Sequence, residues 1–278
     1  MLLAEIFNTN IISCDARQFY REIRIGTFCP DKQMLVSIQH YFIGHLNIWK
    51  TYSAGDYQKD ALKKLNELFT RLPIVFMVGG SGLYGKVFIS GIDYLPFISK
   101  EKSRDLHIKM ILQKELKKKD PILFENNNYH RFFRSLEIIR YSNRSFSSFH
   151  KKITIYHSFH LFHIGLHIPK YILYDNINKR VESMIKCGFI EEAQECYPYG
   201  NLNALKTIGY KHINNFFDGK INFEKVIEEI KKNTKHYAKK QSTWYKKEKI
   251  LQWFITYNEN EIIQNVKKKL TYIIDKMV

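Results

Sequence analysis

The sequence predicts an α/β fold with a parallel sheet, and three observations lead to this prediction. Residues 10–13 contain the apolar pair Ile11–Ile12, which is typical of the end of a buried strand. Residues 57–72 carry apolar side chains at helical spacing, and 74–78 are an unbroken apolar run, typical of a strand buried on both faces. A strand, a helix and a strand in this order favour a parallel sheet.

The other elements follow from the same patterns. Residues 2–7 are typical of the end of a helix, and residues 34–48 are half-alternating and predict extended structure. Ser53 is a suitable N-cap for the helix that Pro73 ends. Further helices are predicted at 98–119, 129–141, 174–185, 190–196, 223–248 and 261–276, and further strands at 159–168 and 251–257.

A glycine-rich turn, Gly79–Tyr84, follows the apolar run directly. Backbone N–H groups in such a strand-to-helix turn can approach an anion, usually phosphate. Residues 80–86 also match the Walker A pattern G-x-x-x-x-G-K, although Val87 stands where a Ser or Thr would hold Mg²⁺. A P-loop nucleotide kinase built on this segment is therefore one hypothesis to test.

Length and composition limit the class of protein. The 278 residues are 45% hydrophobic, enough for one large domain or two smaller ones, and no apolar run approaches the roughly 18 residues of a membrane span. Because Leu2-Leu3-Ala4 gives way at once to Glu5, no signal peptide is predicted and we expect a cytoplasmic protein. The four cysteines lack C-x-x-C pairs and the histidines lack ligand spacing, so we expect reduced thiols and no metal site built from them.

The net charge of +17 suggests an anionic partner, of which nucleic acid is the commonest. An AT-rich genome would also produce this lysine-rich composition, so the position of the charge is more informative than its sum. Four of the ten arginines lie between 131 and 144, three of them within the helix predicted at 129–141 and one just after it. In the helix predicted at 223–248, seven lysines and one histidine lie between 231 and 247. The stripe expected to be buried there is Val226, Ile230, Tyr237 and Trp244.

The candidate site lies in the stretch 10–30. A carboxylate (Asp15), a guanidinium (Arg17) and an amide (Gln18) follow the first predicted strand within four residues. An open α/β sheet presents its site at the carboxyl ends of its strands. The alternative interpretation is an Asx-turn with polar surface side chains.

Several motifs, in order along nearly the whole chain, resemble the tRNA dimethylallyltransferase family. Residues 11–30 resemble the family pattern I-I-S-x-D-S-R-Q-x-Y-x-x-x-x-I-G-T-x-x-P. The other matching segments are Ser53–Tyr57, Gly79–Tyr84, Asp120–Pro121, Arg131–Ile138, Ile208–Lys211 and Lys232–Trp244. Each is weak alone, but seven in order are specific.

The resemblance implies a fold, a reaction and partners. The fold would be a P-loop-kinase-like parallel sheet flanked by helices, with residues 1–98 and 151–278 forming the core and 99–150 a helical insertion that contacts tRNA. The reaction would move a dimethylallyl group from dimethylallyl diphosphate to N6 of adenine 37 in the tRNA anticodon stem-loop. Mg²⁺ would be the cofactor, because the departing diphosphate gains negative charge. The protein would act as a monomer, away from membranes.

The resemblance also implies roles for individual residues. Asp15 would be the base on N6, since an exocyclic amine is a poor nucleophile that needs a carboxylate to take its proton. Lys211 would be catalytic and face the diphosphate. The positions similar to tRNA contacts of the family are Asp15, Ala16, Arg17, Gln18, Ser81, Arg104, His130, Arg131, Phe132, Phe133 and Arg134. At Arg104 the spacing is one residue longer than the family's, and His130 stands where the family has glutamine.

One motif of the family, its phosphate-binding loop, has no match in this sequence. The family begins with G-P-T-x-x-G-K-T, a phosphate-binding loop of the ATP-binding type, on a strand central to the sheet, about a dozen residues before the match to Leu2. We therefore expect that the N-terminal strand and P-loop are missing from this chain. A misplaced start, a loss in a decaying gene, or a non-catalytic RNA-binding relic would each explain this.

Overall fold

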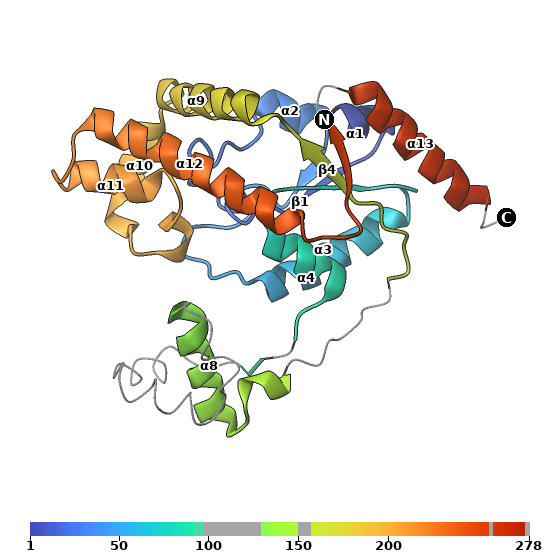
Figure 1. The fold of residues 1–278 in the computed structure, drawn as a ribbon, viewed down its shortest axis with the longest axis horizontal. Coiled ribbons are helices and arrows are strands. Elements are labelled where there is room, and N and C mark those ends of the chain that lie inside the picture. Colours follow the sequence, from blue (N-terminus) through green and yellow to red (C-terminus); the bar gives the residue numbers. More distant parts are fainter. Residues whose placement is uncertain (94, 97–128, 150–156, 256–257, 276–278) are drawn as a thin grey trace. The chain divides into compact units, whose positions relative to one another are not determined.

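The computed structural model describes residues 1–93, 95–96, 129–149, 157–255 and 258–275, with only the backbone for 129–133. The chain divides into two compact units, one formed by Met1–Phe88 and His157–Val278 and the other by Ile89–Tyr156 (Figure 1). The segment 99–150, predicted as an insertion, falls within the second unit. Its predicted boundaries lie in or beside stretches outside the described residues and stay predictions.

The first unit contains a three-stranded parallel sheet in the order β2-β1-β3. The central strand β1 (Ile11–Ser13) is buried throughout and pairs with β2 (His40–Tyr41) and β3 (Phe76–Val78). Residue Ile12 lies opposite Tyr41 on one side and Met77 on the other. The prediction of an α/β fold with parallel strands is confirmed.

Strand β3 lies at one edge of this sheet, and the prediction that 74–78 is buried on both faces is wrong. Phe76 packs against a buried cluster of Ala4, Ile11 and Ile38, but the side chain of Val78 is 54% exposed. An edge strand has one sheet neighbour instead of two, so an unbroken apolar sequence does not guarantee cover on both faces.

The helix that joins β2 to β3 begins where the sequence indicates. Helix α3 (Ala54–Phe69) has Ser53 as its N-cap, and Ser53 and Asp56 form a complete capping box. Its buried Tyr57 donates a hydrogen bond to the carbonyl of Ser13 at 3.0 Å, which ties the helix to the end of β1. Helix α1 (Leu2–Ile6) also matches its prediction.

The extended structure expected from 34 to 48 begins with a helix instead. Helix α2 (Lys32–Ser37) starts after Asp31, whose carboxylate accepts a hydrogen bond from the Met34 N–H at 2.8 Å. The N-cap outweighs the half-alternating pattern over this short segment, because it satisfies a backbone N–H that the first turn leaves free.

Later in the chain, β4 (Ile164–His167) and β5 (Gln252–Ile255) form a two-stranded parallel sheet. Both strands lie inside their predicted ranges, 159–168 and 251–257, and are shorter than predicted. Helix α13 (Glu259–Asp275) follows β5 and buries Ile262 and Val266.

Four helices lie between β4 and β5: α9 (Lys170–Lys186), α10 (Phe189–Cys196), α11 (Tyr210–Phe217) and α12 (Phe223–Tyr245). Single 3₁₀ turns at Tyr197–Tyr199 and Asn203–Leu205 connect α10 to α11. Gly188 separates α9 from α10, with a φ of +95° that favours glycine. Helices α9 and α12 lie side by side (Figure 1).

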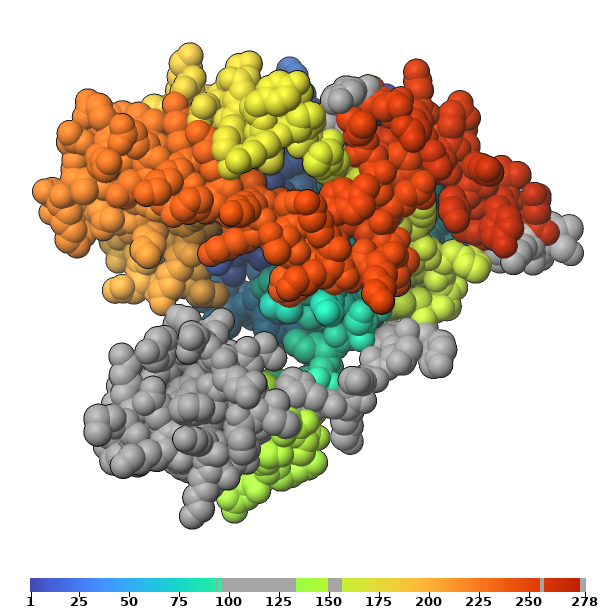
Figure 2. Space-filling model, in the orientation of Figure 1, coloured from blue at the N-terminus to red at the C-terminus, as the bar shows by residue number. Residues whose placement is uncertain are grey.

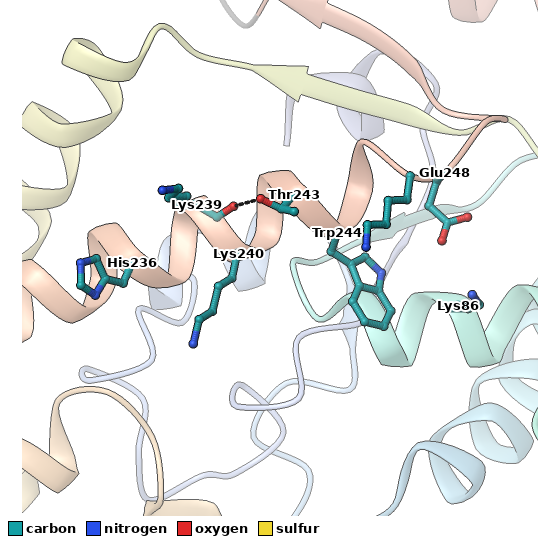
Figure 3. A pocket seen from close by; sticks show the side chains of 8 residues that line it. Lys86, His236, Lys239, Lys240, Thr243, Trp244 and Glu248 are labelled. Carbon is teal, nitrogen blue, oxygen red and sulfur yellow. Dashed lines mark hydrogen bonds between the residues drawn. The ribbon is translucent and has the colours of Figure 1, made fainter. Parts of the chain in front are cut away.

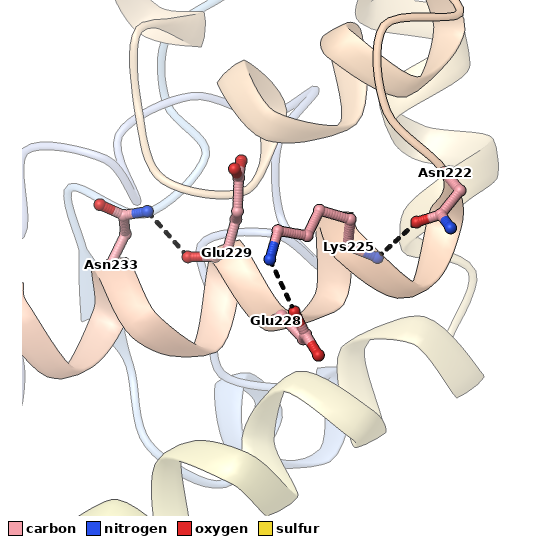
Figure 4. Close-up of polar contacts among 5 residues, drawn as sticks. All are labelled: Asn222, Lys225, Glu228, Glu229 and Asn233. Carbon is pink, nitrogen blue, oxygen red and sulfur yellow. Dashed lines mark hydrogen bonds and ion pairs between the residues drawn. The ribbon is translucent and has the colours of Figure 1, made fainter.

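Helix α12 has two unlike halves. In the first, Asn222 caps the Lys225 N–H, Lys225 pairs with Glu228, and Asn233 donates to the Glu229 carbonyl (Figure 4). Val226 and Ile230 are buried there as predicted. In the second, Tyr237 and Trp244 are 47% and 41% exposed, so the prediction of one buried stripe along the whole helix is wrong.

The second unit contains α8 (Tyr129–Ser142) and the 3₁₀ turn Phe146–Phe149. Leu136, Ile138 and Ile139 are buried. The helix predicted at 129–141 is thus confirmed, whereas the one predicted at 98–119 lies outside the described residues. Across the described part of both units, no helix combines the length and the apolar character that a membrane crossing requires.

Candidate active site

Asp15 lies immediately after Cys14, at the carboxyl end of the central strand β1. Its Oδ1 accepts a hydrogen bond from the Arg17 N–H at 2.9 Å, and its carbonyl accepts one from Gln18 N–H at 3.1 Å. These contacts form an Asx-turn, so that alternative describes the local geometry correctly. The turn also holds a half-buried carboxylate at the edge of the sheet where α/β folds bind substrates.

Ser81, in the turn between β3 and helix α4 (Gly82–Ser90), contacts the Asp15 turn. Its Oγ accepts a hydrogen bond from the Ala16 N–H at 2.9 Å. The Tyr237 hydroxyl from α12 lies near Ser81, and the pKa of Tyr237 is raised by burial and by the negative charge of Asp15. The structure thus brings Asp15, Ala16 and Ser81 together and adds Tyr237, which the sequence pattern assigned to the core.

The glycines of the β3–α4 turn are required by close packing. A Cβ at Gly79 would lie 2.6 Å from the Cys14 carbonyl carbon and 2.8 Å from the Asp15 nitrogen, and one at Gly82 would overlap the Trp244 indole. On α12, Gln241 donates to the Gly80 carbonyl at 2.9 Å. Tyr237, Gln241 and Trp244, spaced i, i+4 and i+7, therefore form one helix face against this turn.

This geometry does not support the nucleotide-kinase hypothesis. A Walker A motif places its glycines and lysine in a loop whose N–H groups surround phosphate. Here α4 begins at Gly82, so Gly85 and Lys86 lie within the helix.

Arg17 and Gln18 make contacts within the protein. The Arg17 Nη1 donates to the Asn203 carbonyl at 2.9 Å and to the Ala204 carbonyl at 3.4 Å. The Gln18 Nε2 donates to the carbonyls of Phe28 at 3.0 Å and Thr27 at 3.3 Å. Both side chains fix the loops around Asp15, and their roles toward adenine stay predictions.

Arg180, on α9, is a cation of this site that sequence reasoning missed. Its Nη2 donates to the Thr27 carbonyl at 3.3 Å. Burial lowers the pKa of Arg180, while the negative charge of Asp15 and the Cys29 thiol oppose that shift. A signal was available, because Arg180 is the only arginine after Arg144 in a lysine-rich sequence.

The loop before Lys211 reaches the site indirectly. Glu192 on α10 accepts hydrogen bonds from the Ile25 and Gly26 N–H groups, both at 2.8 Å, and from the Tyr210 hydroxyl. This carboxylate joins two of the sequence motifs. Lys211 itself is exposed in the first turn of α11, and among the described residues its ammonium makes no hydrogen bond or ion pair with Asp15.

The remaining predicted tRNA contacts belong to the second unit. The Arg134 guanidinium pairs with Glu137 at 3.1 Å and donates to the Pro96 carbonyl at 3.1 Å. The side chains of His130, Arg131, Phe132 and Phe133 and the whole of Arg104 lie outside the described residues, so their roles stay predictions.

An open groove of about 710 Å³ lies between α4 and the second half of α12, and we name it the α12 groove (Figure 3). Its lining residues are Lys86, His236, Lys239, Lys240, Thr243, Trp244, Lys247 and Glu248. In the space-filling view, α12 (orange) and α4 (teal) lie next to one another on one face (Figure 2). Within the described chain, no carboxylate lies within ion-pair distance of its four lysines. Such a groove favours an extended polyanion.

Comparison with known proteins identifies relatives over almost the whole chain. The family model described as IPP transferase matches residues 18–248. A protein of Christiangramia forsetii named tRNA dimethylallyltransferase is 43% identical, over 99% of this chain and 92% of that protein. One of the same name from Flavobacterium psychrophilum is 38% identical, over 97% of this chain and 93% of that protein.

Solved structures show the same similarity. The full-length tRNA isopentenylpyrophosphate transferase of Bacillus halodurans superposes with a TM-score of 0.72 at 28% identity, covering 99% of this chain and 91% of that one. A eukaryotic dimethylallyltransferase acting on tRNA has a TM-score of 0.80 at 21% identity, over 99% of this chain and 74% of that one, which shows a common fold.

Proposed function

The chain belongs to the IPP transferase family and is a transferase that prenylates tRNA, and from this premise we propose the reaction and the residues that carry it. The substrates are dimethylallyl diphosphate and an adenine next to the tRNA anticodon, adenine 37. The adenine N6 attacks C1 of the dimethylallyl group, the C–O bond to diphosphate breaks, and one N6 proton leaves. The products are N6-dimethylallyladenosine and diphosphate. The alternative of a non-catalytic RNA-binding relic is not favoured by relatives named as transferases.

One observation carries the assignment of the base: the Asp15 carboxylate lies at the carboxyl end of β1, with Oδ1 held by the Arg17 N–H. A carboxylate fixed in this way can accept a hydrogen bond from the N6 amine and take its proton as the new C–N bond forms. Ser81 holds the next residue, Ala16, and the Tyr237 hydroxyl of α12 lies near Ser81.

Arg180 is the cation we assign to the departing diphosphate. It lies close enough to Asp15 for the two charges to interact, and no carboxylate of the described chain pairs with it. A fixed guanidinium can accept the negative charge that develops on the leaving oxygen. Lys211, exposed on α11, remains our second candidate for the diphosphate, reaching it only after substrate binds.

The α12 groove is the surface we propose for the tRNA backbone. Four lysines without carboxylate partners in the described part of the chain and a half-exposed Trp244 offer both phosphate contacts and a stacking surface. Extrusion of an anticodon-loop base costs a few kcal/mol, which backbone contacts would offset. The arginine-rich helix α8 of the second unit is a further tRNA surface in this proposal, and the protein acts as a cytoplasmic monomer.

Mg²⁺ stays a proposal, and the described residues limit how it could bind. They contain no group of three His, Cys, Asp or Glu side chains able to hold a metal. Mg²⁺ in phosphate chemistry commonly keeps several waters and binds through substrate phosphates with one or two carboxylates. We therefore assign the ion to the diphosphate, where it would neutralise charge, and no protein residue is assigned as its ligand.

The test is Asp15→Asn in a prenylation assay with dimethylallyl diphosphate and an anticodon stem-loop. Asparagine keeps the acceptor for the Arg17 N–H but cannot take a proton, so we expect kcat to fall by about 10²–10⁴-fold with the circular dichroism spectrum unchanged. Asp31→Asn is the matched control, because asparagine is as good an N-cap as aspartate for α2. Full activity in Asp15→Asn would reject Asp15 as the base.

A further inference from the structure

Phe28 occupies a backbone position that normally belongs to glycine. The Cys29 N–H donates to the Arg24 carbonyl and the Phe28 N–H to the Ile25 carbonyl, both at 2.9 Å. These two nested bonds are those of a Schellman motif, whose left-handed residue is usually glycine. Here that residue is Phe28, with a φ of +56°. A bulky side chain in this region is a strained outlier.

A second phenylalanine with a left-handed backbone shows which kind of contact can offset such strain. Phe42 has a φ of +64°, and its ring packs edge-on against His45 and Tyr57 in the aromatic core. The Phe28 ring is 50% exposed, so core packing does not account for it. Its ring contact within the described chain is the Arg180 guanidinium, whose Cζ lies 4.6 Å from the ring centroid.

The same short loop holds the polar side chains of Arg180 and Gln18. Arg180 donates to the Thr27 carbonyl, and Gln18 donates to the carbonyls of Thr27 and Phe28. The backbone at 27–28 thus fixes the nitrogen end of each side chain, and the guanidinium Cζ lies over the Phe28 ring.

We propose that Phe28 is a positioning residue, which holds the Arg180 guanidinium beside Asp15 in the orientation that meets the diphosphate. This inference rests on the proposed function. A carboxylate partner would hold the guanidinium but would also neutralise it. An aromatic face attracts the cation through its quadrupole, leaves its charge in place and uses none of its N–H donors, so the donors not bonded to Thr27 remain available for phosphate oxygens. A glycine at position 28 would form the same turn without strain, but it would have no ring to contact Arg180. This explains why the strained phenylalanine is kept.

The first experiment separates backbone strain from ring function. Phe28→Gly removes both, so we expect an equal or higher Tm together with about a tenfold weaker affinity for inorganic diphosphate by calorimetry. Phe28→Tyr keeps the ring and should retain affinity. Phe42→Gly is the matched control: it relieves the same strain but removes a core ring, so its Tm should fall. A Phe28→Gly protein with unchanged diphosphate affinity would overturn the proposal.

The second experiment tests whether Phe28 acts through Arg180. In a double-mutant cycle, Phe28→Leu should weaken diphosphate binding and raise the KM for dimethylallyl diphosphate in the wild-type background, and should add little in the Arg180→Gln background, which has no cation at this position. Equal effects in both backgrounds would mean that the ring acts independently, against the proposal. If the wild-type protein binds diphosphate but does not prenylate the stem-loop, the proposed function fails while the cycle still decides the role of Phe28.

Discussion

The two halves of α12 belong to one continuous helix but differ in their contacts and in their expected roles. In the first half, acidic and basic residues alternate, Lys225 and Lys231 have carboxylate partners, and Val226 and Ile230 are buried. In the second half, the lysines of the α12 groove have no such partners within the described chain, and the aromatic side chains are half-exposed. The difference indicates that the first half secures the fold and the second half serves the substrate.

The largest expected effect tests the first half as a structural element. Ile230→Ala removes a side chain that is only 1% exposed, and we expect it to cost about 3 kcal/mol of unfolding free energy in urea. Activity per folded molecule should be unchanged below the transition. Lys232→Ala, on the exposed side of the same turn, is the control. A stable Ile230→Ala protein with lost activity would reverse the assignment of the two halves.

The next effect tests the second half as part of the site. Tyr237→Phe removes the hydroxyl that lies near Ser81 and Asp15, and we expect kcat to fall about tenfold, equivalent to about 1.4 kcal/mol of barrier. The ring remains, so the Tm should change little. Tyr171→Phe, at a tyrosine of α9 that is 76% exposed, is the control. Should Tyr237→Phe lower the Tm and leave kcat unchanged, Tyr237 is a packing residue.

A smaller expected effect is the pH dependence of stability, and it involves His212, which contacts the first half of α12. His212 lies 3.0 Å from the Asn233 amide nitrogen, and burial lowers its pKa, with Glu229 opposing the shift and Lys211 adding to it. The unfolded chain therefore binds the proton more tightly, so stability is complete above about pH 6.5 and falls as the pH drops below that value. The Tm measured from pH 7.5 to 5.5 should decline, and less steeply in His212→Gln. An equal slope in both proteins would exclude His212 as a contributor.

The smallest effect is expected at the Lys225–Glu228 pair. Both side chains are largely exposed at 3.0 Å, and exposed ion pairs contribute little after solvent screening. Lys225→Ala should leave the urea midpoint unchanged within error. A clear loss would mean that the first half depends on its charges as well as on its buried residues.

Much of this could be predicted from the sequence, because some signals are local. Ser53 and Asp56 lie three residues apart and form their capping box with no help from the rest of the chain. The carboxylate of Asp15 follows an apolar pair, and a strand end is enough to place it at the sheet edge.

Other features depend on contacts between distant segments and could not be predicted. Tyr237 and Trp244 share the helical spacing of Val226 and Ile230, but they meet the Gly80–Gly82 turn instead of the core. Arg180 lies more than 150 residues from Thr27, whose carbonyl it contacts. Periodicity shows which residues share a face; it does not show what that face meets.

The division of α12 into a structural half and a tRNA-binding half can be measured by the salt dependence of tRNA binding to three proteins: wild type, Lys239→Ala/Lys240→Ala, and Lys225→Ala/Lys232→Ala. Both variants lose two positive charges from α12, one pair from each half. We expect that only the Lys239/Lys240 variant reduces the slope of log K against log salt, by about 1 to 2. Equal changes in slope for the two variants would contradict it, because the net charge of the helix, and not its second half, would then govern binding.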